Sequence, residues 1–166
     1  MSLDSQRWID HLKLTKHIEG GYFTEAYQSD LILSTGQLPG QFTSARHCCT
    51  HIYFLLEEDQ FSAFHRIKSD ELWHFYAGDA LIVYEIDASG ILTEHVLGQD
   101  PAAHRLFTCI KAGSWFGARL EGNGKYALVG CTVAPGFDYD DFEMGNRDFL
   151  VKQFPLHAVL INSLTR

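Results

Sequence analysis

Histidine and carboxylate side chains gather in the stretch 61–79, FSAFHRIKSDELWHFYAGD. Two of them, His65 and Glu71, stand in short apolar runs that a polar turn at 68–70 separates. Buried histidine and glutamate side chains are costly unless they are paired, bind a metal or take part in a reaction. A carboxylate beside an imidazole orients the ring and stabilises its protonated form, so that the histidine becomes a competent general base. The stretch therefore predicts a pocket suited to proton transfer.

We expect the two runs to form a β-hairpin, in which side chains alternate between two faces. This alternation turns His65 to one face of the first strand and Phe64 to the other. On the second strand Glu71 shares its face with Trp73, and His74 lies opposite unless a bulge reverses the pattern. The predicted pocket thus joins an imidazole and a carboxylate to an indole ring, which could stack on a sugar or another planar ligand.

Short β-branched and aromatic runs supply the scaffold that must hold this hairpin. Further strands are predicted at 22–29, 50–56, 80–86, 91–97, 106–110, 115–120 and 126–133. Runs at spacings of about 8–12 residues are typical of a β-sandwich or barrel. Helices are predicted at 5–14, 148–154 and 156–164. Pro155 separates the last two because proline cannot continue a helix, and 31–41 is expected to be a loop or an irregular edge. We therefore expect one all-β domain over residues 1–166, with short N- and C-terminal helices.

Composition excludes several classes of partner. The chain has 166 residues and a formal net charge of −8, and its Lys and Arg residues form no cluster. Nucleic-acid binding draws its affinity from clustered cations, so no nucleic-acid partner is expected. No apolar run approaches the ~18 residues of a membrane helix, so no membrane partner is expected either.

The N-terminus and the cysteines indicate a cytoplasmic protein. The first ten residues, MSLDSQRWID, carry charges and lack the apolar core of a signal peptide. The cysteines at positions 48, 49, 109 and 131 form no C-x-x-C pair. We therefore expect reduced thiols, which fit a cytoplasmic location.

The predicted hairpin resembles the first motif of the cupin superfamily, whose members are small β-barrels of the jelly-roll, or double-stranded β-helix, type. Glu71, followed after six residues by Gly78, matches the second half of that motif. His65 stands where the first motif histidine can fall, and Ile67 occupies the position of the second histidine. The second cupin motif retains only a glycine, and Phe116 stands at its histidine position.

A more specific resemblance covers nearly the whole chain. It rests on the phrases EGGYF (19–23), IYFLL (52–56), SAFHRIKSDELWHFYAG (62–78), GSWFGARL (113–120), VGCTVAPGFDYDDFE (129–143) and FP (154–155). These phrases look like the cupin_5 subfamily, whose function is unknown. The resemblance implies the jelly-roll fold, and fold neighbours of that subfamily include nucleotide-sugar epimerases and other sugar-processing cupins.

The resemblance and the histidine–glutamate pair favour a small-molecule-binding cupin. Its expected activity is that of a metal-independent isomerase or epimerase on a carbohydrate-like substrate. His65 would be the base and Glu71 its orienting partner. The candidates for ligand contact are Tyr53, Trp73, His74 and Phe116, with Phe54 as the alternative to Tyr53 because parity does not choose between them.

Two alternatives stay open. The resemblance to metal-dependent cupin enzymes would imply three histidines and one glutamate around a divalent ion with open positions. Only His65 and Glu71 remain of these four ligands. Two ligands hold a transition metal poorly, so no cofactor is expected. The second alternative is a non-catalytic protein that binds a small apolar or planar molecule in an aromatic lumen.

A homodimer is expected from the outer faces of the sheets. Phe64, Leu72 and Tyr76 are apolar or aromatic residues that parity turns away from the pocket. Exposed apolar patches usually mark an interface, and most soluble homo-oligomers are twofold dimers. Two copies are therefore expected to pair sheet to sheet.

Overall fold

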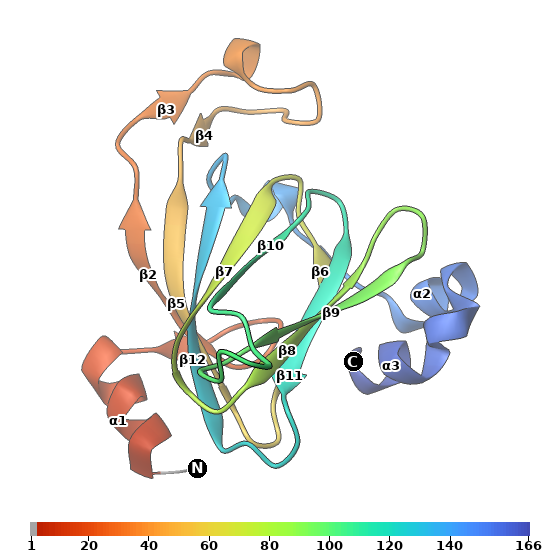
Figure 1. Cartoon of the computed structure of the whole chain (residues 1–166). Helices are drawn as coiled ribbons and strands as arrows, with labels where there is room; N and C mark the ends of the chain where they lie inside the picture. Colours follow the sequence, from red (N-terminus) through yellow and green to blue (C-terminus); the bar gives the residue numbers. More distant parts are fainter. Residues whose placement is uncertain (1–2) are drawn as a thin grey trace.

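Two antiparallel sheets lie face to face in the computed structural model, which describes residues 3–166 (Figure 1). The six-stranded sheet contains, in spatial order, β1 (Thr15–Lys16), β2 (Tyr22–Gln28), β5 (Thr50–Glu57), β12 (Tyr126–Ala134), β7 (Asp70–Gly78) and β10 (Phe107–Ile110). The five-stranded sheet contains β13 (Glu143–Met144), β6 (Phe61–Arg66), β11 (Trp115–Leu120), β8 (Leu81–Ile86) and β9 (Leu92–Leu97). The predicted all-β jelly roll is confirmed, and β13 is a strand that the pattern did not predict.

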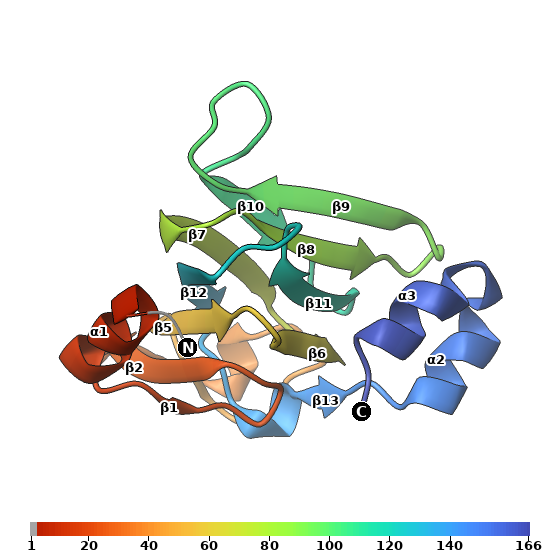
Figure 2. The ribbon, with the colours of Figure 1, turned by 90° about the horizontal axis from the view of Figure 1, so that it is seen from below.

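Three short helices lie at the two ends of the chain (Figure 2). They are α1 (Leu3–Leu12), α2 (Arg147–Gln153) and α3 (Ala158–Ser163). Helix α2 begins where the Asn146 side chain accepts a hydrogen bond from the Phe149 N–H at 3.0 Å, which is an N-cap. Pro155 opens a 3-10 turn between α2 and α3. The predicted helices are therefore confirmed, with ends that differ by a few residues.

The predicted hairpin is wrong. Strands β6 and β7 are consecutive in the sequence, yet β6 pairs with β11 and β13, whereas β7 pairs with β10 and β12. The connection at 67–69 thus crosses from one sheet to the other, as jelly-roll connections do. Because the inner faces of both sheets look into the space between them, His65 and Glu71 meet across that space instead of lying side by side.

The predicted parity of β7 is confirmed. Glu71, Trp73 and Phe75 are buried on its inner face, while His74 and Tyr76 lie on the outer face. The indole and phenyl rings join one apolar core with residues of both sheets. This core fills the space between the sheets next to the ionisable side chains and fixes the strands that carry them.

The C-terminal helices cover the outer face of the five-stranded sheet. Phe64 is 0% exposed there and belongs to one buried cluster with Leu150 and Ile161. The expectation that Phe64 contributes to a free dimer surface is therefore wrong, since the chain's own helices occupy that face. Tyr76 is exposed and Leu72 half-buried on the other sheet. Pairing of two copies through that sheet stays a prediction.

A two-stranded arm extends beyond the ends of β2 and β5 (Figure 1). It consists of β3 (Ile32–Leu33) and β4 (Arg46–His47), with a 3-10 helix at Thr35–Gln37 between them. The arm includes the predicted loop at 31–41 and brings Arg46 to the base of the projection. Within the described residues no helix is long and apolar enough to cross a membrane. The four cysteines are free.

Replacing Phe64 with alanine is expected to lower the free energy of unfolding by about 3–5 kcal/mol, because it opens a cavity under helices α2 and α3. Urea titration followed by circular dichroism measures this change. The matched control is Phe149→Ala on α2, whose side chain is 51% exposed. That variant is expected to cost less than about 1 kcal/mol. Equal losses of unfolding free energy in the two variants would contradict the burial of Phe64 under helices α2 and α3.

Candidate functional site

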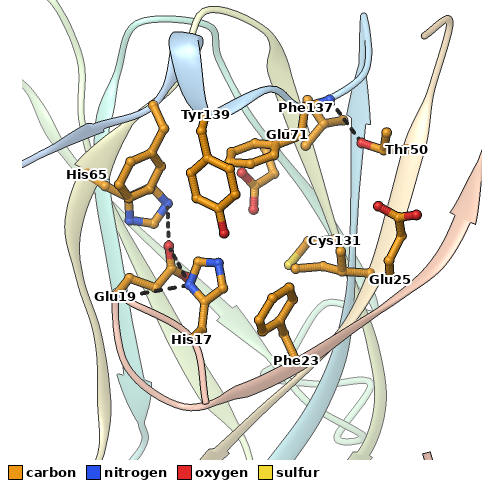
Figure 3. A pocket seen from close by; sticks show the side chains of 13 residues that line it. His17, Glu19, Phe23, Glu25, Thr50, His65, Glu71, Cys131, Phe137 and Tyr139 are labelled. Atoms are coloured by element: carbon orange, nitrogen blue, oxygen red, sulfur yellow. Dashed lines mark hydrogen bonds and ion pairs between the residues drawn. The ribbon is translucent and has the colours of Figure 1, made fainter. Parts of the chain in front are cut away.

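A cavity of about 120 Å³ lies between the inner faces of the two sheets (Figure 3). Its walls come from five strands, from the turn before β2 and from the segment that follows β12. The lining residues are His17, Glu19, Phe23, Glu25, Thr50, Ile52, His65, Glu71, Cys131, Val133, Phe137, Tyr139 and Phe142. The structure therefore brings His65 and Glu71 into one pocket, together with groups that the sequence pattern did not assign.

His65 has a protein partner at each ring nitrogen. Its Nδ1 lies 2.7 Å from the Ala63 carbonyl oxygen, and its Nε2 lies 3.2 Å from Glu19 Oε2. A carbonyl can only accept, so Nδ1 must carry a proton. Neutral His65 then presents a lone pair at Nε2. The contact with Glu19 is attractive only when one proton lies between the imidazole and the carboxyl group.

Glu19 is buried and fixed in place. Its Oε1 accepts a hydrogen bond from the Ser62 hydroxyl at 3.0 Å, and His17 Nδ1 lies 3.5 Å from its Oε2. Gly20 makes the tight turn that follows possible, because its φ is +117° and a Cβ there would sit 2.0 Å from the Phe61 carbonyl oxygen. The turn thus aims the carboxyl group of Glu19 at His65.

Burial moves the protonation of this pair toward the neutral forms. It lowers the pKa of His65, against a smaller raising effect of Glu71. Burial also raises the pKa of Glu19, although His17 acts in the opposite direction. The pKa of His17 is lowered, again chiefly by burial. A cavity that disfavours every charge in this way favours neutral imidazoles and a protonated carboxyl group.

Glu71 faces the cavity from the opposite sheet. Burial raises its pKa to about 7, and the charge of Glu19 adds to the rise, while His65 opposes it. The Cys131 thiol also favours the carboxylate but does not offset burial, and the buried Trp73 indole N–H has no hydrogen-bond partner among the described residues. The thiol keeps its proton, since burial raises the pKa of Cys131 well above its ordinary value. Glu71 can therefore exchange a proton near neutral pH.

Aromatic rings close the cavity. The segment after β12 supplies Phe137, Tyr139 and Phe142. The Phe142 ring stacks on the His65 ring, with centroids 5.2 Å apart and an interplanar angle of 28°. The Phe137 and Tyr139 rings meet edge to face at 5.1 Å. On the other side Phe23 packs edge to face on His17 at 4.5 Å. The ionisable groups are thus enclosed by rings.

A buried ion pair ties the aromatic segment to the arm. Arg46 Nε and Nη2 donate to the two carboxylate oxygens of Asp141, each at 2.7 Å, and both side chains are almost fully buried. Lys68 Nζ adds a contact of 3.0 Å to the same carboxylate. The pair fixes Asp141, and Phe142 is the next residue in the chain. The ion pair thus anchors the segment whose Phe142 ring stacks on His65.

Trp73 and Phe116 do not line the cavity. Their side chains are 0% and 1% exposed and belong to the core behind its wall. Phe116 supports the site from behind, because its ring centroid lies 4.1 Å from that of His65. The expectation that these two rings stack on a ligand is corrected accordingly, since the closed core leaves them no accessible face.

Tyr53 and His74 lie on the outer face of the six-stranded sheet, away from the cavity. His74 Nε2 and His51 Nδ1 contact the Thr132 hydroxyl at 3.1 and 2.7 Å. Tyr53 packs there against the Tyr76 ring at 5.8 Å. The bulge that would have turned His74 inward does not occur at its position on β7. Phe54, the alternative to Tyr53, is buried in the core.

The residues present do not fit the metal set of a cupin. Ile67 and Phe116, both buried, occupy the second and third histidine positions. Both ring nitrogens of His65 already have protein partners. Among residues 3–166 no group of three or more His, Cys, Asp or Glu side chains is arranged to hold a metal ion.

Sequence reasoning missed Glu19, His17 and the aromatic segment. The phrases at 19–23 and 129–143 contain Glu19 and Phe142, but parity within one predicted hairpin could not relate them to His65. A glutamate followed by two glycines is the local signal that the sequence offers, and both glycines adopt positive φ in the structure.

Glu71→Gln is expected to make unfolding stability less dependent on pH. The pKa of Glu71 rises from 4.5 to about 7 on folding, so the protonated form stabilises the fold at low pH. That stability is lost as pH rises through about 7, by up to about 3 kcal/mol. Urea titrations between about pH 5 and pH 8 should show that the free energy of unfolding of the wild type falls relative to that of Glu71→Gln as pH rises. For the exposed control Glu94→Gln, the difference in unfolding free energy from the wild type should not change with pH. A difference that is equally constant for Glu71→Gln would contradict the raised pKa of Glu71.

Asp141→Asn is expected to cost about 3 kcal/mol of unfolding free energy, because it removes the two-oxygen partner of the buried Arg46 guanidinium and leaves only the longer contact of 4.0 Å to Asp138 as an ion pair. The double variant Arg46→Met, Asp141→Leu removes both charges and should recover most of that loss. Thermal and urea unfolding of the two variants measure this. An exposed pair, Lys125–Glu58, serves as the control, and its Glu58→Gln variant should cost less than about 1 kcal/mol. A double variant as unstable as the single one would argue against the pairing.

Comparisons with known proteins agree with this fold. The Cupin_5 model, described as cupin superfamily (DUF985), matches residues 6–145. A crystal structure of a Shewanella oneidensis protein is 36% identical with a TM-score of 0.88, and the match covers 98% of this chain and 97% of that one. A hypothetical protein from Leishmania major is 30% identical, with a TM-score of 0.87 and coverage of 97% and 98%.

A more distant likeness concerns the fold alone. Oxalate decarboxylase from Bacillus subtilis is 13% identical with a TM-score of 0.54, and the match covers 90% of this chain but 36% of that one. No curated protein matches the chain. Cupin neighbours and the family model together support a small-molecule-binding cupin. Because the Cupin_5 model matches most of the chain, the chain belongs to the Cupin_5 family of the cupin superfamily.

Proposed function

We propose that this cupin is a metal-independent isomerase of the epimerase type, acting on a small carbohydrate-like carbonyl compound. The observation that carries this proposal is the arrangement of His65 between the Ala63 carbonyl and Glu19, with Glu71 in the opposite wall. One side of the cavity can accept a proton, and the other side can supply one. Proton abstraction beside a carbonyl needs this combination of a base and an acid.

His65 is the base in this scheme, and Glu19 replaces Glu71 as its partner. When Glu19 is ionised, its carboxylate faces the lone pair on His65 Nε2 and makes that nitrogen more basic. A proton taken from carbon fills the position between Nε2 and Oε2 and turns a repulsive contact into an ion pair. Ala63 keeps the ring in the tautomer whose lone pair is on Nε2, the nitrogen that faces Glu19.

Glu71 is the acid. Its raised pKa keeps a large share of the carboxyl groups protonated at neutral pH. In the forward step the C–H bond next to the carbonyl breaks, its proton moves to His65, and its electron pair forms the enediol double bond. The carbonyl oxygen takes the proton of Glu71. Return of the proton from His65 to the neighbouring carbon, while the Glu71 carboxylate takes a proton from the hydroxyl on the original carbon, gives the isomer. Return to the original carbon, while Glu71 takes its proton back from the oxygen, restores the substrate or, on the opposite face, gives the epimer. Neither route needs an oxidant.

His65→Ala is expected to lower solvent deuterium exchange by at least about 100-fold, the usual contribution of a general base. The assay incubates small keto sugars such as dihydroxyacetone and erythrulose with the protein in D₂O and follows deuterium beside the carbonyl by NMR. Glu71→Gln should lose the exchange as well, and the exposed His11→Ala should retain it. The wild-type rate should follow a bell-shaped pH profile, with an acid limb from the His65–Glu19 pair and an alkaline limb from Glu71 near pH 7.

Exchange that is equal in His65→Ala and wild type would sink the proposal. Binding of the same sugars with no exchange in any form of the protein would assign the cavity to a ligand-binding protein instead. Circular dichroism of each variant confirms that the fold is intact before rates are compared.

A further inference from the structure

We propose that the ligand of this cavity is a single-ring molecule that carries a positive charge, of the class of cyclic amines and amino sugars. This inference rests on the proposed function only in taking the cavity as the active site. It deepens that proposal by naming the charge and the size of the molecule that the walls accept. The reasons are the charges of the lining, the aromatic walls and the volume.

The lining contains carboxyl groups without a fixed cation. Glu19, Glu25 and Glu71 line the cavity, and no Lys or Arg does so. Arg46, in the neighbouring network, is fully engaged by both oxygens of Asp141. Outside the lining, Arg166 donates to the Glu19 carbonyl oxygen, and its charge lowers the pKa of Glu19. An anionic ligand such as a sugar phosphate would meet carboxyl groups and no cation within the lining, at a high cost in a buried site. A cation would supply the charge that the walls lack.

Glu71 is the group that such a cation would face. It is 7% exposed, lies in the cavity wall and forms no ion pair with Lys or Arg within the described residues. The titratable groups that act on it are His65, Glu19 and the Cys131 thiol, and none of them carries a permanent positive charge. An ammonium group beside Glu71 favours its carboxylate, so an amine that lacks a carbonyl should release a proton to solvent where Glu71 was protonated. In a substrate that has a carbonyl oxygen, that oxygen receives the same proton.

The aromatic rings provide the second, independent reason. Phe23, Phe137, Tyr139 and Phe142 surround the cavity, and Figure 3 shows the Tyr139 ring reaching into it with its hydroxyl toward the centre. Ring faces attract cations within about 6 Å of their centroids, and rings combined with carboxylates form the cages that recognise ammonium groups. Glu25 stands on the opposite side of the cavity from His65, where its carboxylate can attract a cation.

The volume limits the ligand to one ring. The cavity measures about 120 Å³. An engineered cavity of about 150 Å³ in another protein holds a benzene molecule. This cavity is somewhat smaller, so it encloses one small ring at most, any substituent must lie toward its mouth, and a nucleotide-sugar could not be enclosed in it.

Three probes of the same shape test the charge: cyclohexylamine, cyclohexanol and cyclohexanecarboxylate. Calorimetric titration of the full chain should show the amine binding at least about tenfold more tightly than the alcohol, and no binding of the carboxylate. The amine titration, repeated near neutral pH in two buffers of different ionisation enthalpy, should reveal proton release. Its affinity should rise as pH increases through about 7, the pKa of Glu71, whereas the alcohol should bind equally well across that range.

Glu71→Gln should reduce the amine affinity by about tenfold or more and leave the alcohol affinity unchanged. Glu25→Gln provides a second variant, at an exposed position that should not affect folding, and Glu94→Gln on β9 provides the control. Amine and alcohol affinities that are equal, a preference for the carboxylate, or no binding of any probe would each overturn the inference. Deuterium exchange that depends on His65 while the amine fails to bind would overturn the charge inference alone. Amine binding without any exchange would sink the proposed function and leave the charge preference standing.

Discussion

The site depends on one constraint, which is that several ionisable groups lose water together in a cavity whose lining contains no Lys or Arg. Glu19, His65 and Glu71 cannot all be charged there, because each charge would be desolvated and two of the three have the same sign. Protons must balance the charges instead. One of these protons is on His65 Nδ1, which donates a hydrogen bond to the Ala63 carbonyl oxygen. Every property that we assign to the pocket follows from this shared set of protons.

The fold brings ionisable groups from distant parts of the chain together in this cavity. Glu19 comes from the turn before β2, His65 from one sheet and Glu71 from the other. Their separation across the cavity leaves room for a ligand, which neighbours on one hairpin would not. The Arg46–Asp141 pair anchors the aromatic segment beside the cavity.

Periodicity and motif reasoning predicted much of this structure. The alternation of buried residues on β7 predicted that Glu71 faces inward and His74 outward, because the pleat allows no other pattern without a bulge. The strand spacing and the cupin-like phrases predicted the jelly roll. The predicted hairpin was wrong, because a three-residue connection between two strands is compatible with a hairpin and also with a crossing between sheets, and the sequence pattern is the same for both.

The parts of the site that were missed depend on contacts far apart in the sequence. Glu19 lies in a glycine-rich turn and Phe142 after the last long strand, and only the closed barrel brings them to His65. Trp73 and Phe116 were predicted to stack on a ligand because the sequence pattern gives only the side of the strand on which each side chain lies. Their depth behind the cavity wall is decided by packing, which parity does not reveal.

The protonation of His65 is the most direct test of this site. Nitrogen-15 NMR of the ring across neutral pH reports which nitrogen carries the proton and at what pH the second proton is lost. We predict that Nδ1 stays protonated throughout, that Nε2 titrates below the ordinary histidine pKa, and that Glu19→Gln shifts this titration. An Nε2–H tautomer, or a titration at the ordinary pKa that ignores Glu19, would contradict the shared proton on which the site depends.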